Sequence, residues 1–370
     1  MVFKPIYNLE LLDYHADSPI PLIEGLCCCS DIHVLEYIYN NFYDLVCWSN
    51  LSNNPHAIPL LERHLNETLP GENSIVWRCL SQNPNAIPLL EEHLDKVHWG
   101  FLSSNPNALH LLEQHVDKVR WGALSINPNA NAIHLLEQHL DKLTLKDWHH
   151  MSTNPNAIHL LEHNLDKVDW KRLSFNPSAI SLLEKHLDKV NWFMLSKNPN
   201  AIHILEKHTN KINWVALSEN PNAIHILERN QDKIDWFNLS KNPNAIRLLE
   251  QNMDKICWCV LSGNPNAICL LERNPDKIHW DVVAFNPNAT KLLNNKIVQD
   301  ENSNDINWYA IGKHPRVLEI IGSLHTEKMR EQCRPFACEL AEAVFHPSRL
   351  VRLCEMYDMD LVDYMELIGD

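Results

Sequence analysis

The chain has 370 residues, of which 45% are hydrophobic, and a formal net charge of −15. It lacks any apolar run of the roughly 18 residues that a membrane helix needs and the basic-then-apolar opening of a signal peptide, so we expect a soluble protein without a membrane span. Acids are concentrated in residues 1–46 and 316–370, which leaves the middle near neutral and without the basic face that nucleic-acid binding requires.

Eleven cysteines are present, and three of them are adjacent, Cys27 to Cys29. An odd and uneven set does not resemble a disulfide framework. A reducing, intracellular setting is therefore expected, with the three adjacent thiols in packing roles.

Tryptophan recurs along most of the chain at intervals of 22 residues, and a fixed period of this size indicates a repeat array. Stacked repeats grow as one domain, so chain length does not set the domain count. We expect an N-terminal capping segment over 1–46, a repeat solenoid over 47–315 and a helical C-terminal cap over 316–370. The segment Phe345 to Leu350 echoes the repeat and predicts one further, degraded copy.

Each repeat begins with a first helix over Trp-x-x-Leu-Ser. Trp and Leu share a helix face at this spacing, which places both in the core. Asp or Asn before Trp suits an N-cap, as at Asp147, Asp169, Asn191, Asn213, Asp235 and Asn307. The predicted core tryptophans are Trp99, Trp121, Trp170, Trp192, Trp214, Trp236 and Trp258.

The Asn-Pro pair that follows ends this helix, because a residue before proline avoids the α region. A second helix runs over Ala-Ile-x-Leu-Leu-Glu. Pro59 and Pro88 near its start favour His56 and Asn85 as its caps, since proline is then too early to break a hydrogen bond. The His or Asn after this helix tolerates a left-handed conformation, which we predict there.

These elements predict an all-α fold, an α/α solenoid (superhelix) of about 12 regular 22-residue two-helix repeats with degenerate capping units at both ends. With neighbouring helices about 9 Å apart, the array would extend about 100 Å. Leucine-rich repeats share the period, but they need a Leu-x-Leu strand that the Asn-Pro pair contradicts.

One position of the second helix carries histidine in several repeats and could form a ladder that binds a partner or responds to pH. The alternative is that these residues are ordinary solvent-facing side chains. Asp-Lys pairs after this helix should form rows of exposed opposite charges, which stabilise little. The candidate binding residues are His110, His134, His159, His203, His225 and Arg247, together with Phe193 and Phe237 of the first helix.

Two groups of cysteine and histidine invite a zinc interpretation: Cys257, Cys259, Cys269 and His279, and Cys333, Cys338, Cys354 and His346. Neither group has the paired spacing of a zinc site, so buried cysteines explain them as well and no metal is predicted. Gly-rich phosphate loops and nucleophile motifs are also lacking. We therefore predict neither an enzyme nor a cofactor.

The repeat motif Leu-Ser-x-Asn-Pro-Asn-Ala-Ile-His-Leu-Leu-Glu-x-Asn/His-x-Asp-Lys-Ile-x-Trp resembles that of uncharacterised proteins of giant DNA viruses of protists. The resemblance covers residues 47–315, and the ending around Phe345 to Leu367 is similar to their closing module. It implies a viral origin and a place in the host cytoplasm or the virion, and it carries no catalytic residues.

Two functions remain open at this point. The first is a protein–protein interaction scaffold, whose specificity would lie where repeats differ, at Phe101, Arg172, Phe193, Phe237, Phe175, Lys197, Glu219 and Lys241. The second is a structural component of a virus particle.

Overall fold

The computed structural model describes residues 7–8, 19–67, 75–299, 305–321 and 323–324. The chain divides into two compact units, one of residues 1–14 with 322–370 and one of residues 15–321. In the smaller unit, β1 (Tyr7–Asn8) pairs antiparallel with β2 (Ser323–Leu324), and Tyr7 lies opposite Leu324. The degraded repeat expected at Phe345 to Leu350 lies outside the described residues.

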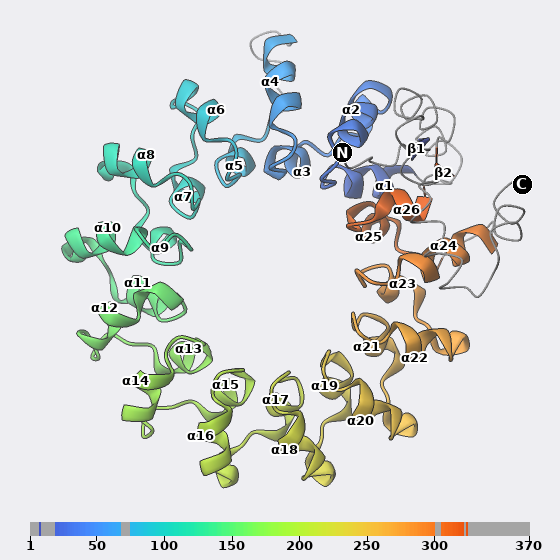
Figure 1. Cartoon of the computed structure of the whole chain (residues 1–370). Coiled ribbons are helices and arrows are strands. Elements are labelled where there is room, and N and C mark those ends of the chain that lie inside the picture. The colour runs from blue at the N-terminus through green and yellow to red at the C-terminus, as the bar shows by residue number, and fades with distance from the viewer. Residues whose placement is uncertain (1–6, 9–18, 68–74, 300–304, 322, 325–370) are drawn as a thin grey trace, which may run out of the picture. The chain divides into compact units, whose positions relative to one another are not determined.

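In the larger unit the described residues form helices alone, which confirms the predicted all-α solenoid of two-helix repeats. Figure 1 shows that helix pairs follow one another around a ring, with the odd-numbered helices on its inner side. This inner row comprises α1 (Pro19–Leu26), α3 (Trp48–Asn53), α5 (Trp77–Leu80), α7 (Trp99–Leu102), α9 (Trp121–Leu124), α11 (Leu145–Met151), α13 (Trp170–Phe175), α15 (Trp192–Lys197), α17 (Trp214–Ser218), α19 (Trp236–Lys241), α21 (Trp258–Ser262), α23 (Trp280–Val283) and α25 (Trp308–Lys313).

The even-numbered helices form an outer row around the inner one (Figure 1). This outer row comprises α2 (Ile32–Asn41), α4 (Ile58–Glu67), α6 (Ile87–Glu92), α8 (Leu109–Gln114), α10 (Ala132–Gln138), α12 (Ile158–Glu162), α14 (Ile180–Lys185), α16 (Ile202–Lys207), α18 (Ile224–Glu228), α20 (Ile246–Glu250), α22 (Ile268–Glu272), α24 (Thr290–Gln299) and α26 (Val317–Ile321).

Short 3₁₀ helices complete the repeats. Most of them follow a helix of the outer row and return the chain to the inner row; η5 instead precedes α12. They are η2 (Tyr43–Leu45), η3 (Val116–Lys118), η4 (Leu140–Lys142), η5 (Pro155–Ala157), η6 (Thr209–Lys211), η7 (Gln231–Lys233), η8 (Met253–Lys255) and η9 (Pro275–Lys277).

The ring is closed by α1 and α25, which pack against each other from opposite ends of the larger unit. Gly25 and Gly312 lie at this contact. A β-carbon on Gly312 would stand 2.5 Å from the backbone oxygen of Leu22 and 2.8 Å from the Cα of Gly25. The elongated array expected from the sequence is therefore replaced by a ring, because the first and last helix pairs bury their faces against each other.

A ladder of buried asparagines joins successive repeats. The amide of Asn220 donates to the backbone oxygens of Ser196 (3.0 Å) and Asn198 (3.0 Å) in the preceding repeat. Its Oδ1 accepts from the backbone N–H of Asn222. Each buried polar group of the turn thus has a partner, as burial requires. The ladder consists of Asn54, Asn83, Asn105, Asn127, Asn154, Asn176, Asn198, Asn220, Asn242, Asn264 and Asn286.

The predicted caps His56 and Asn85 are wrong. The residue before α6 is Ala86, with no side-chain cap, and the turn is held by Asn83, whose Oδ1 accepts from Asn85. Asn85 donates instead to the carbonyl of Pro55 in the preceding repeat, 3.0 Å away. Asn107 does the same to Pro84, and the equivalent bond forms in repeats that have histidine in place of Pro88. Pro59 and Pro88 are tolerated because each is the second residue of its helix, where a backbone N–H has no acceptor within the helix.

The helices of the inner row are capped as predicted where Asp or Asn precedes Trp. Five such side chains accept from a backbone N–H of the first turn, those of Asp169, Asn191, Asn213, Asp235 and Asn307. Asp147 is an exception and its predicted capping role is wrong. The inserted Thr144 to Lys146 lengthen α11, so that Thr144 becomes the N-cap and Asp147 completes a capping box.

The predicted left-handed residue after the outer helix is also wrong. His93 and Asn230 have φ of −129° and −135°. The asparagine amide donates back to a helix carbonyl, from Asn230 to Ile226 at 2.8 Å, whereas the His93 ring packs on Trp77 with 5.2 Å between centroids. These contacts, rather than a positive φ, explain why either His or Asn stands at this position.

The tryptophans are half-buried rather than fully buried, except Trp148, which is 2% exposed. The lysine of the Asp-Lys pair covers the outer part of the indole; Lys118, for example, lies 4.9 Å from the Trp99 ring centre. Such a contact combines cation–π attraction with burial of the lysine stem. The predicted core tryptophans in this half-buried position are Trp99, Trp121, Trp170, Trp192, Trp214, Trp236 and Trp258.

The completely buried positions are smaller residues. In each regular repeat they are the leucine of the inner helix, the second leucine of the outer helix, an alanine before it, and the polar Ser and Asn of the Leu-Ser-x-Asn-Pro motif. The serine joins repeats too: Ser81 Oγ accepts from the backbone N–H of His98 at 2.9 Å. The core is therefore built from leucine packing and from side-chain hydrogen bonds between neighbouring repeats.

Candidate functional site

Large apolar side chains stay exposed mainly on the inner row. In the described residues, no helix of the outer row carries one. Exposed apolar groups that lie close together are a feature of surfaces that bind other macromolecules. Those in or directly after inner helices are Ile20, Ile126, Leu145, Phe175, Phe193, Val215, Phe237 and Phe285.

Three of these side chains occupy the same position in consecutive repeats. Phe193, Val215 and Phe237 each follow the repeat tryptophan, and their exposed fractions are 42%, 49% and 51%. Their helices α15, α17 and α19 pack side by side. Together with Lys197 and Lys241 of the same helices, they define what we call the inner patch.

The inner patch is also charged. Lys241 Nζ lies 4.7 Å from the Phe237 ring centre, and Lys197 Nζ lies 5.6 Å from that of Phe193. Lys197 forms an ion pair with Glu219 of the next repeat, with 2.9 Å between Nζ and Oε2. The patch therefore combines aromatic rings with ammonium groups, of which only one has a carboxylate partner here.

The two rows differ in charge. Helices of the inner row contain seven Lys or Arg residues and three Asp or Glu residues, whereas those of the outer row contain six and fourteen. The inner row is thus basic in a chain whose net charge is −15. An acidic partner would be attracted to the inner side and repelled by the outer side.

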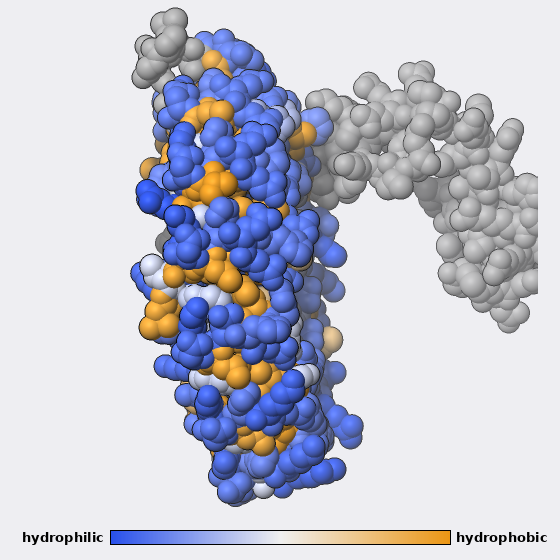
Figure 2. All heavy atoms as spheres, turned by 90° about the vertical axis from the view of Figure 1, so that its left-hand side faces the viewer, coloured by the Kyte–Doolittle hydropathy of each residue, from blue (hydrophilic) through white to orange (hydrophobic). Residues whose placement is uncertain are grey.

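The predicted histidine row lies on the outer helices, where Figure 2 shows a mainly hydrophilic surface with separate apolar patches. These histidines contact glutamates of the preceding repeat, as His110 does with Glu91 (2.7 Å) and His225 with Glu206 (2.9 Å). The same pairing joins His203 to Glu184 and His159 to Glu137. The row therefore links repeats to one another.

Glu137 has two histidine neighbours. A hydrogen bond from His159, supported by one from His134, lowers the pKa of this carboxyl, although partial burial opposes the shift. His134 belongs to the same helix, at 3.3 Å. Arg247 occupies the histidine position in α20 and is exposed. A partner-binding role for this row stays a prediction.

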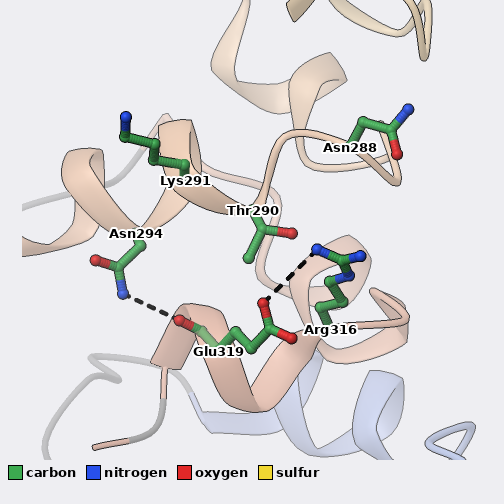
Figure 3. A pocket seen from close by; sticks show the side chains of 6 residues that line it. All are labelled: Asn288, Thr290, Lys291, Asn294, Arg316 and Glu319. Atoms are coloured by element: carbon green, nitrogen blue, oxygen red, sulfur yellow. Dashed lines mark hydrogen bonds and ion pairs between the residues drawn. The ribbon is translucent and has the colours of Figure 1, made fainter. Parts of the chain in front are cut away.

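One surface pocket of about 400 Å³ lies where α24 meets α26 (Figure 3). Arg316 and Glu319 form an ion pair across it at 3.9 Å, and Asn294 donates to the Glu319 carbonyl at 3.2 Å. The buried Thr290 Oγ1 makes no hydrogen bond to the described part of the chain. The arginine and the Asn294 amide of this pocket are therefore already engaged within the protein.

The described residues contain no group of three or more His, Cys, Asp or Glu placed to hold a metal ion. Of the two candidate zinc groups, that of Cys333, Cys338, Cys354 and His346 lies outside the described residues. Burial raises the pKa of Cys27 to about 12 and also raises those of Cys28 and Cys29. These thiols stay protonated and fit the predicted packing role.

No family model, curated protein or solved structure matches the chain. Over the described residues, no helix has the length and apolar character needed to cross a membrane. Within the ring, the inner patch is the candidate site, because it joins exposed apolar side chains of consecutive repeats with lysines.

Proposed function

We propose that the chain is a non-enzymatic scaffold that binds another protein through the inner row of its ring. The observation that supports this function is the concentration of large exposed apolar side chains on that row, Phe193 and Phe237 among them. Exposed aromatic rings are costly in water and are enriched where proteins bind each other.

The construction of the ring supports the same proposal. The buried asparagine and serine hydrogen bonds fix each repeat against its neighbours, so the exposed side chains of the inner row are held in a preset arrangement. A surface that is ordered before binding loses less entropy when a partner docks. The repeat-to-repeat differences then fall on exposed positions such as Phe175, Lys197 and Glu219, where a partner can be selected.

Affinity purification of the tagged full chain from cells that express it, followed by mass spectrometry, tests this function. We expect proteins that the wild-type chain retains and that an F175S/F193S/F237S/F285S variant loses. A matched variant of the outer row, H203Q/H225Q/R247Q, should retain them. The absence of any reproducible protein partner, or partners that both variants retain equally, would overturn the proposal.

A further inference from the structure

We infer that the inner patch binds an acidic, extended segment of a partner protein that carries a large apolar side chain at every third residue. This inference rests on the proposed scaffold function and specifies its partner. It follows from the spacing of the patch and from its charge.

The spacing of the apolar side chains in the inner patch favours an extended segment as the partner. Phe193, Val215 and Phe237 recur once per repeat on helices that pack side by side, and packed helices lie about 8–10 Å apart. A polyproline II chain advances about 3.1 Å per residue with three residues per turn, so its positions i, i+3 and i+6 recur every 9 Å or so on one side. In a β-strand, side chains on one face recur at every second residue, about 6.6 Å apart, and this spacing does not match that of the repeats.

The positive charge of the inner patch favours an acidic segment as the partner. Lys197 and Lys241 stand beside the exposed phenylalanines, and the inner row as a whole is basic while the outer row is acidic. Asp or Glu residues between the apolar anchors of a bound segment would lie within reach of these ammonium groups. Glu219, which pairs with Lys197, would have to share that lysine with the incoming carboxylate.

A protein segment fits this surface better than a nucleic acid. The apolar side chains of the patch need apolar partners, and one of its two lysines is already paired with a carboxylate. A nucleic acid is held mainly by neutralising several successive phosphates, and this patch has two ammonium groups, of which that of Lys197 is paired with Glu219.

A random peptide library displayed on phage and selected on the immobilised full chain tests the inference. Enriched sequences should be rich in Asp and Glu and should carry Phe, Leu, Ile or Met at three-residue intervals. One enriched peptide, labelled with fluorescein, then gives dissociation constants by fluorescence anisotropy. F193S/F237S should weaken its binding by about tenfold or more, as expected for the loss of two aromatic anchors.

Two control variants complete the test. L140S removes an exposed leucine of η4, outside the inner row, and should change the affinity by less than about twofold. K197E/K241E should weaken binding and reduce its dependence on salt. Since all of these side chains are at least partly exposed, circular dichroism should report the same helical content for each variant.

Enrichment of basic peptides, an affinity that F193S/F237S leaves unchanged, or tighter binding of a labelled single-stranded oligo-dT than of the peptide would each overturn this inference. The scaffold function would survive those results if purified partners still depended on the inner row. If no partner is purified at all, the scaffold function fails whatever the peptides do, so the two failures can be told apart.

Discussion

Gly25 and Gly312 bring the backbones of α1 and α25 into direct contact, although 286 positions separate them in the sequence. A β-carbon on Gly312 would lie 2.5 Å from the Leu22 oxygen and 2.7 Å from the Leu26 nitrogen, both of them backbone atoms that cannot turn aside. We expect G312A to lower the free energy of unfolding by about 1 to 3 kcal/mol, as overpacking does. Urea unfolding followed by circular dichroism measures the change.

Gly263 provides the matched control. Its added β-carbon would meet the Val282 side chain at 3.3 Å, which can adjust, and its backbone is right-handed helical. G263A should therefore leave stability within about 0.5 kcal/mol of the wild type, or raise it by reducing the freedom of the unfolded chain. Equal losses in G312A and G263A would mean that the glycine contact does not hold the ring closed.

The asparagine ladder predicts a large effect of a small substitution. N220A removes both donated bonds and the bond that Asn220 Oδ1 accepts from Asn222 N–H. The Asn198 oxygen keeps its bond from Ala201 N–H, whereas the buried Ser196 oxygen loses its bond from Asn220. With about 1–3 kcal/mol for the Ser196 oxygen and about 0.5–1.5 kcal/mol for each other lost bond, we expect a loss of about 2 to 4 kcal/mol. N222A loses one exposed bond to Pro199 and should cost less than about 1 kcal/mol. Similar losses for the two variants in urea unfolding would contradict the ladder.

His314 ends this ladder and predicts a pH dependence. Its Nε2 lies 3.1 Å from the Asn286 oxygen, and its Nδ1 accepts from the backbone N–H of Arg316. The imidazole therefore makes the same two kinds of contact as an asparagine amide of the ladder, one to the preceding repeat and one within its own turn. Burial lowers its pKa below 6.5; the bond to Asn286 and the Glu319 charge oppose this shift, while the Arg316 charge adds to it. The unfolded chain therefore takes up a proton first, and stability falls as pH drops below about 6.5.

The variant H314N isolates this effect. Asparagine occupies the same place in the other repeats and does not titrate, so H314N should flatten the decline of the thermal midpoint between about pH 7 and pH 5. Other histidines, including His64, whose pKa burial also lowers, remain in both proteins and cancel in the comparison. Parallel pH curves for wild type and H314N would show that His314 does not titrate in a buried state.

Replacing Cys257 with a capping residue should stabilise the protein. Cys257 precedes α21 with φ of −86° and ψ of 92° and makes no side-chain cap, whereas Asp235 caps α19 from a similar backbone conformation. C257D should raise the free energy of unfolding by about 1 kcal/mol through the added cap. D235A should lower it by about the same amount. A neutral or destabilising C257D would show that this cap position is not equivalent from repeat to repeat.

Much of the repeat could be predicted from the sequence because its signals are local. Trp at a 22-residue period, Asp or Asn before it and proline after the first helix fix where two short helices begin and end. The caps of the outer helices are misplaced by one residue, because a proline is compatible with the second as well as the third position of a helix. The turn is placed by the buried Asn83, which bonds to the preceding repeat, and no argument from a single repeat includes that contact.

Ring closure could not be predicted, since it depends on a small rotation between neighbouring repeats that accumulates around the whole array. The sequence contains one indication of closure. The chain has only eight glycines, and Gly312 stands where regular repeats have the serine that accepts a hydrogen bond from the next repeat. Differences between repeats single out Phe193 and Phe237 in the sequence, and their role in binding stays a prediction. The basic inner side and the acidic outer side follow only from the arrangement of the helices in two rows.

Closure of the ring is tested most directly by an intramolecular cross-link between α25 and the residues just after α1. Burial raises the pKa of Cys28, and the charge of Lys313 partly opposes this, because the ammonium group lies close to the thiol. A short reagent that joins an amine to a thiol, applied at alkaline pH where the Cys28 thiol ionises, should therefore link Lys313 to Cys28 in the monomeric fraction at every protein concentration, as peptide mass spectrometry would detect. An open array predicts no such link in the monomer. Its absence from a fully helical wild-type protein whose Cys28 reacts with a monofunctional thiol reagent at the same pH would contradict the ring.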